Sequence, residues 1–197
     1  CAYSPAPVLT SELQARVMAE IIQPTVEEMA RRGTPFQGVL YAGLMIRDGQ
    51  ARLVEYNVRF GDPEIQAIAL RLGAQLLDLA LACAEGRLAG ARVNWAEDHA
   101  LTVVIAAAGY PGDHARGEAI GLPAIEDPRA RIFHAGTRIE GGELVSAGGR
   151  VLNAAARGAT IDHAIAGTSI PDWDNPANAC AIAGSLGLEC AAFDINS

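Results

Sequence analysis

The chain has few cysteines, few aromatic residues and a deficit of positive charge. Only 4 of its 197 residues are cysteines, with no CxxC spacing, so reduced and mostly buried thiols in a cytoplasmic protein are predicted. Lys and Arg number 15 against 23 Asp and Glu, and this net charge of −8 argues against generic binding to nucleic acid or anionic membranes. Because no apolar run approaches ~20 residues, no transmembrane helix is predicted.

The composition is otherwise that of an ordered protein with a real core. Half of the residues are hydrophobic and 19% are charged, and the length fits one or two domains. The chain starts with Cys1 rather than Met, and the run Phe193 to Ser197 does not resemble a natural end. We therefore expect a piece of a longer protein.

The most informative residues are Glu55, Asn57 and Arg59, which are spaced two apart in a run that predicts a strand. This spacing places their side chains on one face of the strand, together with Leu53. Carboxylate and amide oxygens suit Mg²⁺, which takes few protein ligands and the rest from water and phosphate. A neighbouring guanidinium suits a phosphate or acyl-phosphate oxygen. The pattern favours a phosphoryl-transfer site, although a half-solvated strand gives the same alternation.

The residues before this run predict a helix and a hairpin. Apolar spacing predicts a helix over 11–32, with Thr10 as its N-cap and a kink or split at Pro24. Two strands, 37–46 and 51–59, are then joined around Asp48-Gly49, a strong hairpin signal.

A second helix is predicted to start at Asp62-Pro63-Glu64, with an apolar stripe that ends near Gly86. Capping explains Asp62 and Glu64 at least as well as a direct role in chemistry. From Leu101 the texture changes to short strands separated by glycine turns, predicted at 101–107, 131–139, 143–147 and 150–156. The four histidines are widely spread beside no carboxylate pattern typical of a metal site, and a structural role is predicted for His134.

The run from Glu55 to Glu64 resembles the signature of the phosphoribosylamine–glycine ligase family, ATP-grasp enzymes of purine biosynthesis. Other segments resemble the same family in the same order, namely 2–7, 22–26, 40–46, 107–113, 133–137 and 148–152. The resemblance covers the chain from Ala2 to about Thr160.

The resemblance implies an α+β fold: the C-terminal half of an ATP-grasp fold over 1–90, with helices on an antiparallel sheet, and a small β-rich domain over 91–160. It implies ATP-dependent joining of glycine to phosphoribosylamine through an acyl phosphate. Glu55 and Asn57 would hold Mg²⁺ or Mn²⁺ on the ATP phosphates, and Arg59 would bind ATP and steady the transferred group.

Further expectations follow from the same resemblance. The loop Ala2 to Pro7 would lie near the phosphoribosyl substrate, and the full-length parent would be a monomer. The family's N-terminal domain and most of its adenine-clamping segment lie upstream of Cys1. The chain alone is therefore expected to bind ATP poorly and to show no measurable turnover.

The last segment, 161–197, resembles a different family, the β-ketoacyl-(acyl-carrier-protein) synthase III condensing enzymes. It is similar to a strand–helix–strand part of their thiolase fold, which predicts a chimera joined near residue 160, either a genuine fusion or an assembly artefact. That family's nucleophilic cysteine would follow Asn196, so Cys180 and Cys190 are expected to be core thiols without condensing activity.

Two alternatives stay open at this point. One is a non-catalytic β-rich module that packs or oligomerises through 101–156. The other is a fragment of a condensing enzyme, which the absence of the nucleophile disfavours.

Overall fold

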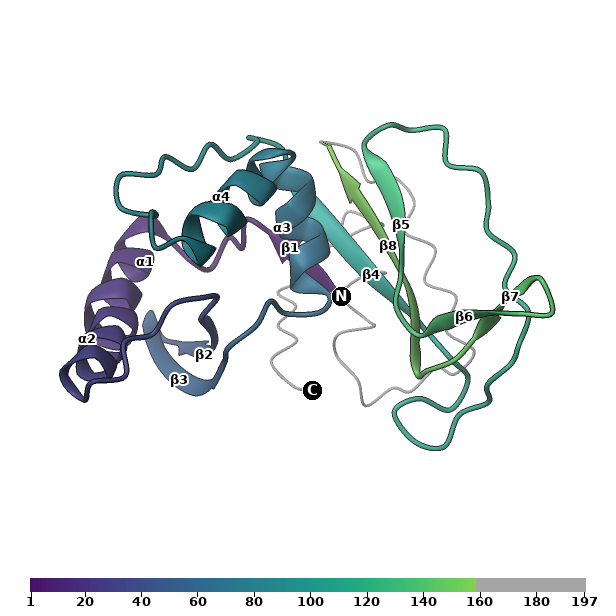
Figure 1. Ribbon diagram of the computed structural model, residues 1–197, viewed down its shortest axis with the longest axis horizontal. Helices are drawn as coiled ribbons and strands as arrows, with labels where there is room; N and C mark the ends of the chain where they lie inside the picture. The colour runs from purple at the N-terminus through teal and green to yellow at the C-terminus, as the bar shows by residue number, and fades with distance from the viewer. Residues whose placement is uncertain (159–197) are drawn as a thin grey trace. The chain divides into compact units, whose positions relative to one another are not determined.

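The computed structural model describes residues 1–158, which form two compact units (Figure 1). Unit 1 comprises residues 1–4, 63–71 and 96–158, and unit 2 comprises residues 5–62 and 72–95. Both units are built from helices or antiparallel strands, so the predicted α+β class is confirmed at this level. The predicted foreign tail, 161–197, lies outside the described residues.

A nearly continuous helical run opens unit 2, as predicted for 11–32. It consists of α1 (Ser11–Val17), η1 (Met18–Ile22) and α2 (Gln23–Arg31). Thr10 caps the run, because its Oγ1 accepts a hydrogen bond from the backbone N–H of Leu13 at 3.2 Å.

The predicted break at Pro24 takes the form of a π-helical turn. At the end of η1 the N–H of Gln23 donates to the carbonyl of Met18, five residues back. Pro24 follows directly and has no N–H to donate, so the wider turn lets the helix continue past it. Gly33 ends the run with a φ of +78°, a conformation that favours glycine.

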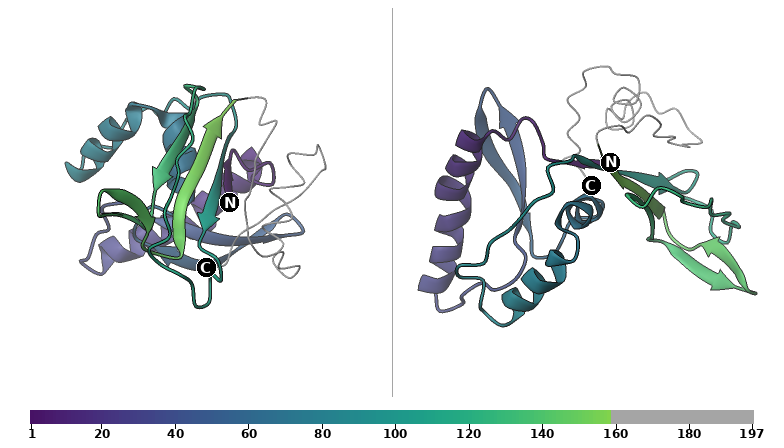
Figure 2. Two further views of the ribbon diagram at one scale, coloured as in Figure 1. Left: turned by 90° about the vertical axis from the view of Figure 1, so that its right-hand side faces the viewer. Right: turned by 90° about the horizontal axis from the view of Figure 1, so that it is seen from above.

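The hairpin of unit 2 is confirmed, with two differences. Strands β2 (Tyr41–Arg47) and β3 (Gln50–Asn57) pair through a turn in which Asp48 and Gly49 both have positive φ. The strands are shorter than predicted, and β3 ends before Arg59. Figure 2 shows the helical run lying alongside the hairpin.

The helix predicted from Asp62 to about Gly86 is two helices, so that prediction is corrected. They are α3 (Glu64–Leu72) and α4 (Gln75–Ala84), separated at Gly73, which has a φ of +58°. No single helix of the described chain is long and apolar enough to span a membrane; α3 and α4 pass that test only as a bent pair.

Unit 1 contains a four-stranded antiparallel sheet in the order β1-β4-β8-β5 and a separate hairpin of β6 and β7 (Figure 1). The strands are β1 (Ala2–Ser4), β4 (Ala100–Ala106), β5 (Ala130–His134), β6 (Thr137–Glu140), β7 (Glu143–Ser146) and β8 (Arg150–Arg157). The expectation of a loop over Ala2 to Pro7 is wrong for residues 2–4, which form the edge strand β1 paired with β4.

The strand predicted over 131–139 is divided at Gly136, where the chain passes from the sheet to the hairpin. A Cβ atom at Gly136 would lie 2.6 Å from the carbonyl oxygen of Arg150 and 2.8 Å from Gly148, so only glycine fits there. His134, for which a structural role is predicted, makes a 3.1 Å hydrogen bond between its Nδ1 and the Thr137 hydroxyl. The core of unit 1 centres on Ala107, Val151 and Leu152.

Candidate functional site

One face of strand β3 is fastened to the helical run by a cluster of hydroxyl groups. The Tyr56 hydroxyl lies 2.8 Å from Thr25 Oγ1 and donates to the carbonyl of Ile21 at 3.1 Å. Thr25 Oγ1 also donates to the Ile21 carbonyl, at 2.8 Å. Since Tyr56 stands between Glu55 and Asn57 in a strand, its neighbours are turned to the other face.

A β-bulge at Val54 decides which residues share that other face. Gly43 pairs with Glu55 and Leu44 pairs with Leu53, so Val54 is an extra residue in β3. Because Gly43 and Leu44 are adjacent on β2 and point to opposite faces, their partners Glu55 and Leu53 do as well. The prediction that Leu53 shares the face of Glu55 is therefore wrong: Leu53 lines a hollow with Tyr56 and the helical run.

Glu55 and Asn57 form a pair of oxygen ligands on this face. Asn57 Nδ2 donates to Glu55 Oε1 at 2.8 Å, which confirms that the two side chains lie together. Glu55 is exposed and Asn57 half-buried, and within residues 1–158 the remaining Oε2 and Oδ1 accept no hydrogen bond. A carboxylate and an amide oxygen side by side fit a hard divalent cation that keeps water and phosphate among its ligands.

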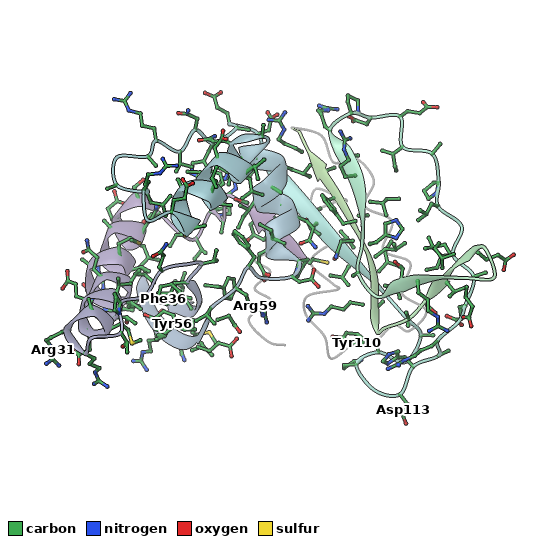
Figure 3. The ribbon with its side chains drawn as sticks, viewed as in Figure 1. Arg31, Phe36, Tyr56, Arg59, Tyr110 and Asp113 are labelled. Atoms are coloured by element: carbon green, nitrogen blue, oxygen red, sulfur yellow. The ribbon has the colours of Figure 1, made fainter. Side chains whose placement is uncertain are left out.

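Arg59 does not belong to this row, because β3 ends two residues before it. It lies on the segment that follows β3 (Figure 3), and its Nη1 donates to the carbonyl of Phe60 at 2.9 Å. The guanidinium is exposed. The structure thus brings Glu55 and Asn57 together, and Arg59 makes no hydrogen bond or ion pair with either of them.

Across residues 1–158, no group of three or more His, Cys, Asp and Glu side chains is arranged to hold a metal ion. A metal at the Glu55–Asn57 pair would have two protein ligands and would take the rest from water and phosphate. Such a pair suits a metal that is bound together with a nucleotide or phosphate compound.

Sequence reasoning missed three residues that shape the site: Thr25, Tyr56 and Gly43. Thr25 lies about thirty positions from Tyr56, so their contact is non-local and no spacing pattern reveals it. Gly43 had a usable signal, since glycine inside a strand often marks a bulge or a close approach.

Comparison with known proteins places two segments of the chain in one family. Residues 1–65 match the family model of the phosphoribosylglycinamide synthetase ATP-grasp (A) domain, and residues 100–169 match that of the same enzyme's C domain. Both matched segments belong to the phosphoribosylglycinamide synthetase family. The second match extends nine residues past the predicted junction at residue 160.

Relatives of the chain include phosphoribosylamine–glycine ligases, which are ATP-grasp ligases. It is 49% identical over 178 residues to that ligase of Rhizobium meliloti, covering 88% of this chain and 42% of the relative. It is 52% identical over 164 residues to that of Mesorhizobium japonicum, covering 83% and 39%. The chain spans about two-fifths of the length of these relatives.

Solved structures show the same relation. The phosphoribosylamine–glycine ligase of Thermotoga maritima superposes with a TM-score of 0.69 at 32% identity, over 81% of this chain and 39% of that one. A single-chain, multi-domain long-chain acyl-CoA carboxylase superposes with a TM-score of 0.56 over 80% of this chain and 18% of that one, at 18% identity, which is a likeness of fold alone.

Proposed function

We propose that the chain is a part of a phosphoribosylamine–glycine ligase that carries the metal–phosphate end of its ATP site. The observation that carries the proposal is the 2.8 Å contact between Asn57 Nδ2 and Glu55 Oε1 on the open face of β3. The names of the relatives supply the substrates: phosphoribosylamine and glycine, with ATP for a synthetase of the ATP-grasp class.

Glycine's carboxylate is a poor electrophile, and the reaction must activate it. Transfer of the γ-phosphoryl group of ATP to a carboxylate oxygen forms an acyl phosphate and ADP. The amine of phosphoribosylamine then attacks the acyl carbon, phosphate leaves, and the new amide nitrogen loses a proton. A bound Mg²⁺ or Mn²⁺ supplies charge neutralisation at the phosphates.

Within that reaction the residues of this chain bind and orient. The Glu55 carboxylate contributes a negative charge and Asn57 a neutral oxygen to the cation. Arg59 carries a permanent positive charge on the neighbouring segment. If its guanidinium donated to a phosphate oxygen in place of the Phe60 carbonyl, the new contact would be a charge-assisted hydrogen bond.

The proposal extends to the remaining properties of the chain. By itself it has no ligase turnover, because it spans only about two-fifths of its relatives. The parent is a cytoplasmic monomer, and residues 161–197 add no condensing activity.

A thermal melt with Mg²⁺-ATP tests the metal–phosphate role. A ligand that binds the native state raises its stability, so millimolar Mg²⁺-ATP should raise the melting temperature of the chain, and Glu55→Gln should abolish that rise. Glu20→Gln removes an exposed carboxylate of the helical run and is the matched control, for which the rise should persist. An equal rise in Glu55→Gln and the unchanged chain contradicts the proposal, as does no rise in either.

A phosphate-release assay tests the second part. The chain alone should release no phosphate from ATP in a manner dependent on both glycine and phosphoribosylamine. Release that requires both substrates shows that the chain is a complete enzyme and overturns the statement that it lacks turnover.

A further inference from the structure

Gly43 stands at an unusual place for a glycine. It lies in the middle of strand β2, directly opposite Glu55. Its φ is outside the left-handed region, so its backbone conformation is open to any residue, in contrast to Gly33 and Gly49. Glycine weakens a strand interior, because it gains no side-chain packing and loses more conformational freedom on folding. Backbone geometry therefore does not explain its presence.

The space around position 43 explains the presence of a glycine better. An ideal Cβ built at Gly43 would lie 3.3 Å from Glu55 Cγ and 3.6 Å from the Glu55 carbonyl oxygen. The first of these distances is shorter than an ordinary van der Waals contact between carbon atoms. The Glu55 side chain thus occupies the room that a side chain at position 43 would take.

The β-bulge at Val54 makes this arrangement specific to Glu55. If the pairing on the turn side of the bulge continued unchanged, Glu55 would pair with Ala42. The extra residue at Val54 shifts the register by one, so that Glu55 pairs with Gly43, the residue that has no side chain. Bulges re-aim side chains in this way beside functional sites.

We propose that Gly43 is a positioning residue of the metal–phosphate site: by leaving room over Glu55, it holds the carboxylate beside Asn57 in the orientation that binds the cation. The proposal rests on the proposed function of the Glu55–Asn57 pair. It adds a residue that touches neither the cation nor the nucleotide.

The consequence of adding a methyl group follows from the exposure of Glu55. The Cγ atom belongs to a flexible, exposed side chain, so Gly43→Ala is relieved by rotation of Glu55 and not by movement of the backbone. The fold should survive, and the contact of Asn57 Nδ2 with Glu55 Oε1 should be lost.

The experiment follows the side-chain amide signals of Asn57 by NMR in the full 197-residue chain, with Mn²⁺ added in the presence of ATP. Mn²⁺ should broaden these signals in the unchanged chain, and Gly43→Ala should require about threefold to tenfold more Mn²⁺ for the same broadening, the range that a displaced rotamer explains. Leu44→Ala, on the other face of the same strand, is the matched control and should broaden like the unchanged chain.

The outcomes separate the two proposals. If Glu55→Gln prevents broadening but Gly43→Ala does not alter it, the metal site stands and the role of Gly43 is refuted. If the unchanged chain shows no broadening, or Glu55→Gln broadens normally, the proposed function fails and the role of Gly43 fails with it. Should Gly43→Ala not fold, nuclear Overhauser contacts between Gly43 Hα and Glu55 Hγ in the unchanged chain are still required, and their absence overturns the inference.

Discussion

Removal of the Tyr56 hydroxyl tests whether β3 is fastened to the helical run as described. Tyr56→Phe deletes the 3.1 Å bond to the Ile21 carbonyl and the 2.8 Å contact with Thr25. The carbonyl is not left without a donor, because Thr25 Oγ1 still donates to it. One net hydrogen bond in a half-buried place is worth about 0.5–1.5 kcal/mol, so we expect the free energy of unfolding to fall by about 1 kcal/mol.

Urea unfolding of single and double variants measures this value. Thr25→Val should lower the free energy of unfolding by a similar amount. In the double variant the loss should be smaller than the sum of the two single losses by about 0.5 kcal/mol or more, because both hydroxyls donate to one carbonyl. Thr34→Val, which removes an exposed and longer 3.3 Å bond to Met29, is the matched control and should cost under about 0.5 kcal/mol. If the losses of unfolding free energy at Tyr56 and Thr25 are additive, or are no larger than in the control, the two hydroxyls do not hold β3 against the helical run.

Two further predictions concern unit 1. Gly136→Ala should destabilise the chain by about 1–3 kcal/mol, because the new Cβ meets the Arg150 carbonyl, whereas Gly121→Ala, which has open space, should have little effect in the same urea assay. Hydrogen bonds from Arg129 lower the pKa of Asp127 from 3.8 to about 2. The stabilisation by this pair is therefore complete above pH 3.8 and is lost as the pH falls through about 2. NMR titration of the Asp127 carboxyl should show the low pKa, and Arg129→Gln should return it toward 3.8; an unchanged pKa in that variant contradicts the assigned cause.

Local chemistry was readable from the sequence. Thr10, Pro24 and the Asp48-Gly49 turn each act through residues within five positions, and each performs its predicted role or, for Pro24, produces the predicted break in a milder form. A cap, a missing N–H and a pair of positive φ angles depend little on distant contacts.

Features that depend on partners elsewhere were not readable. Strand β1 exists because Ala2 to Ser4 pairs with β4, almost a hundred residues away. The predicted helix is broken at Gly73 and the predicted strand at Gly136, but other glycines of the chain cause no such break. The sequence does not distinguish these two glycines from the others.

The same division holds at the site. Alternation correctly placed Glu55 beside Asn57, because both lie beyond the bulge in a regular stretch. Alternation placed Leu53 on the wrong face of β3, because the extra residue at Val54 turns the Leu53 side chain to the opposite face. It also failed for Arg59, because β3 ends at Asn57.

Binding of Mn²⁺ in the presence of ATP, followed by the electron paramagnetic resonance signal of the free ion, tests the central claim most directly. The affinity of a carboxylate site follows its charge, so Glu55→Gln should weaken binding by about tenfold or more and Asn57→Asp should strengthen it. Opposite shifts in these two variants, with no shift in Glu20→Gln, are the predicted result. Equal affinity in all of them would show that the Glu55–Asn57 pair is a solvated strand face and not a metal site.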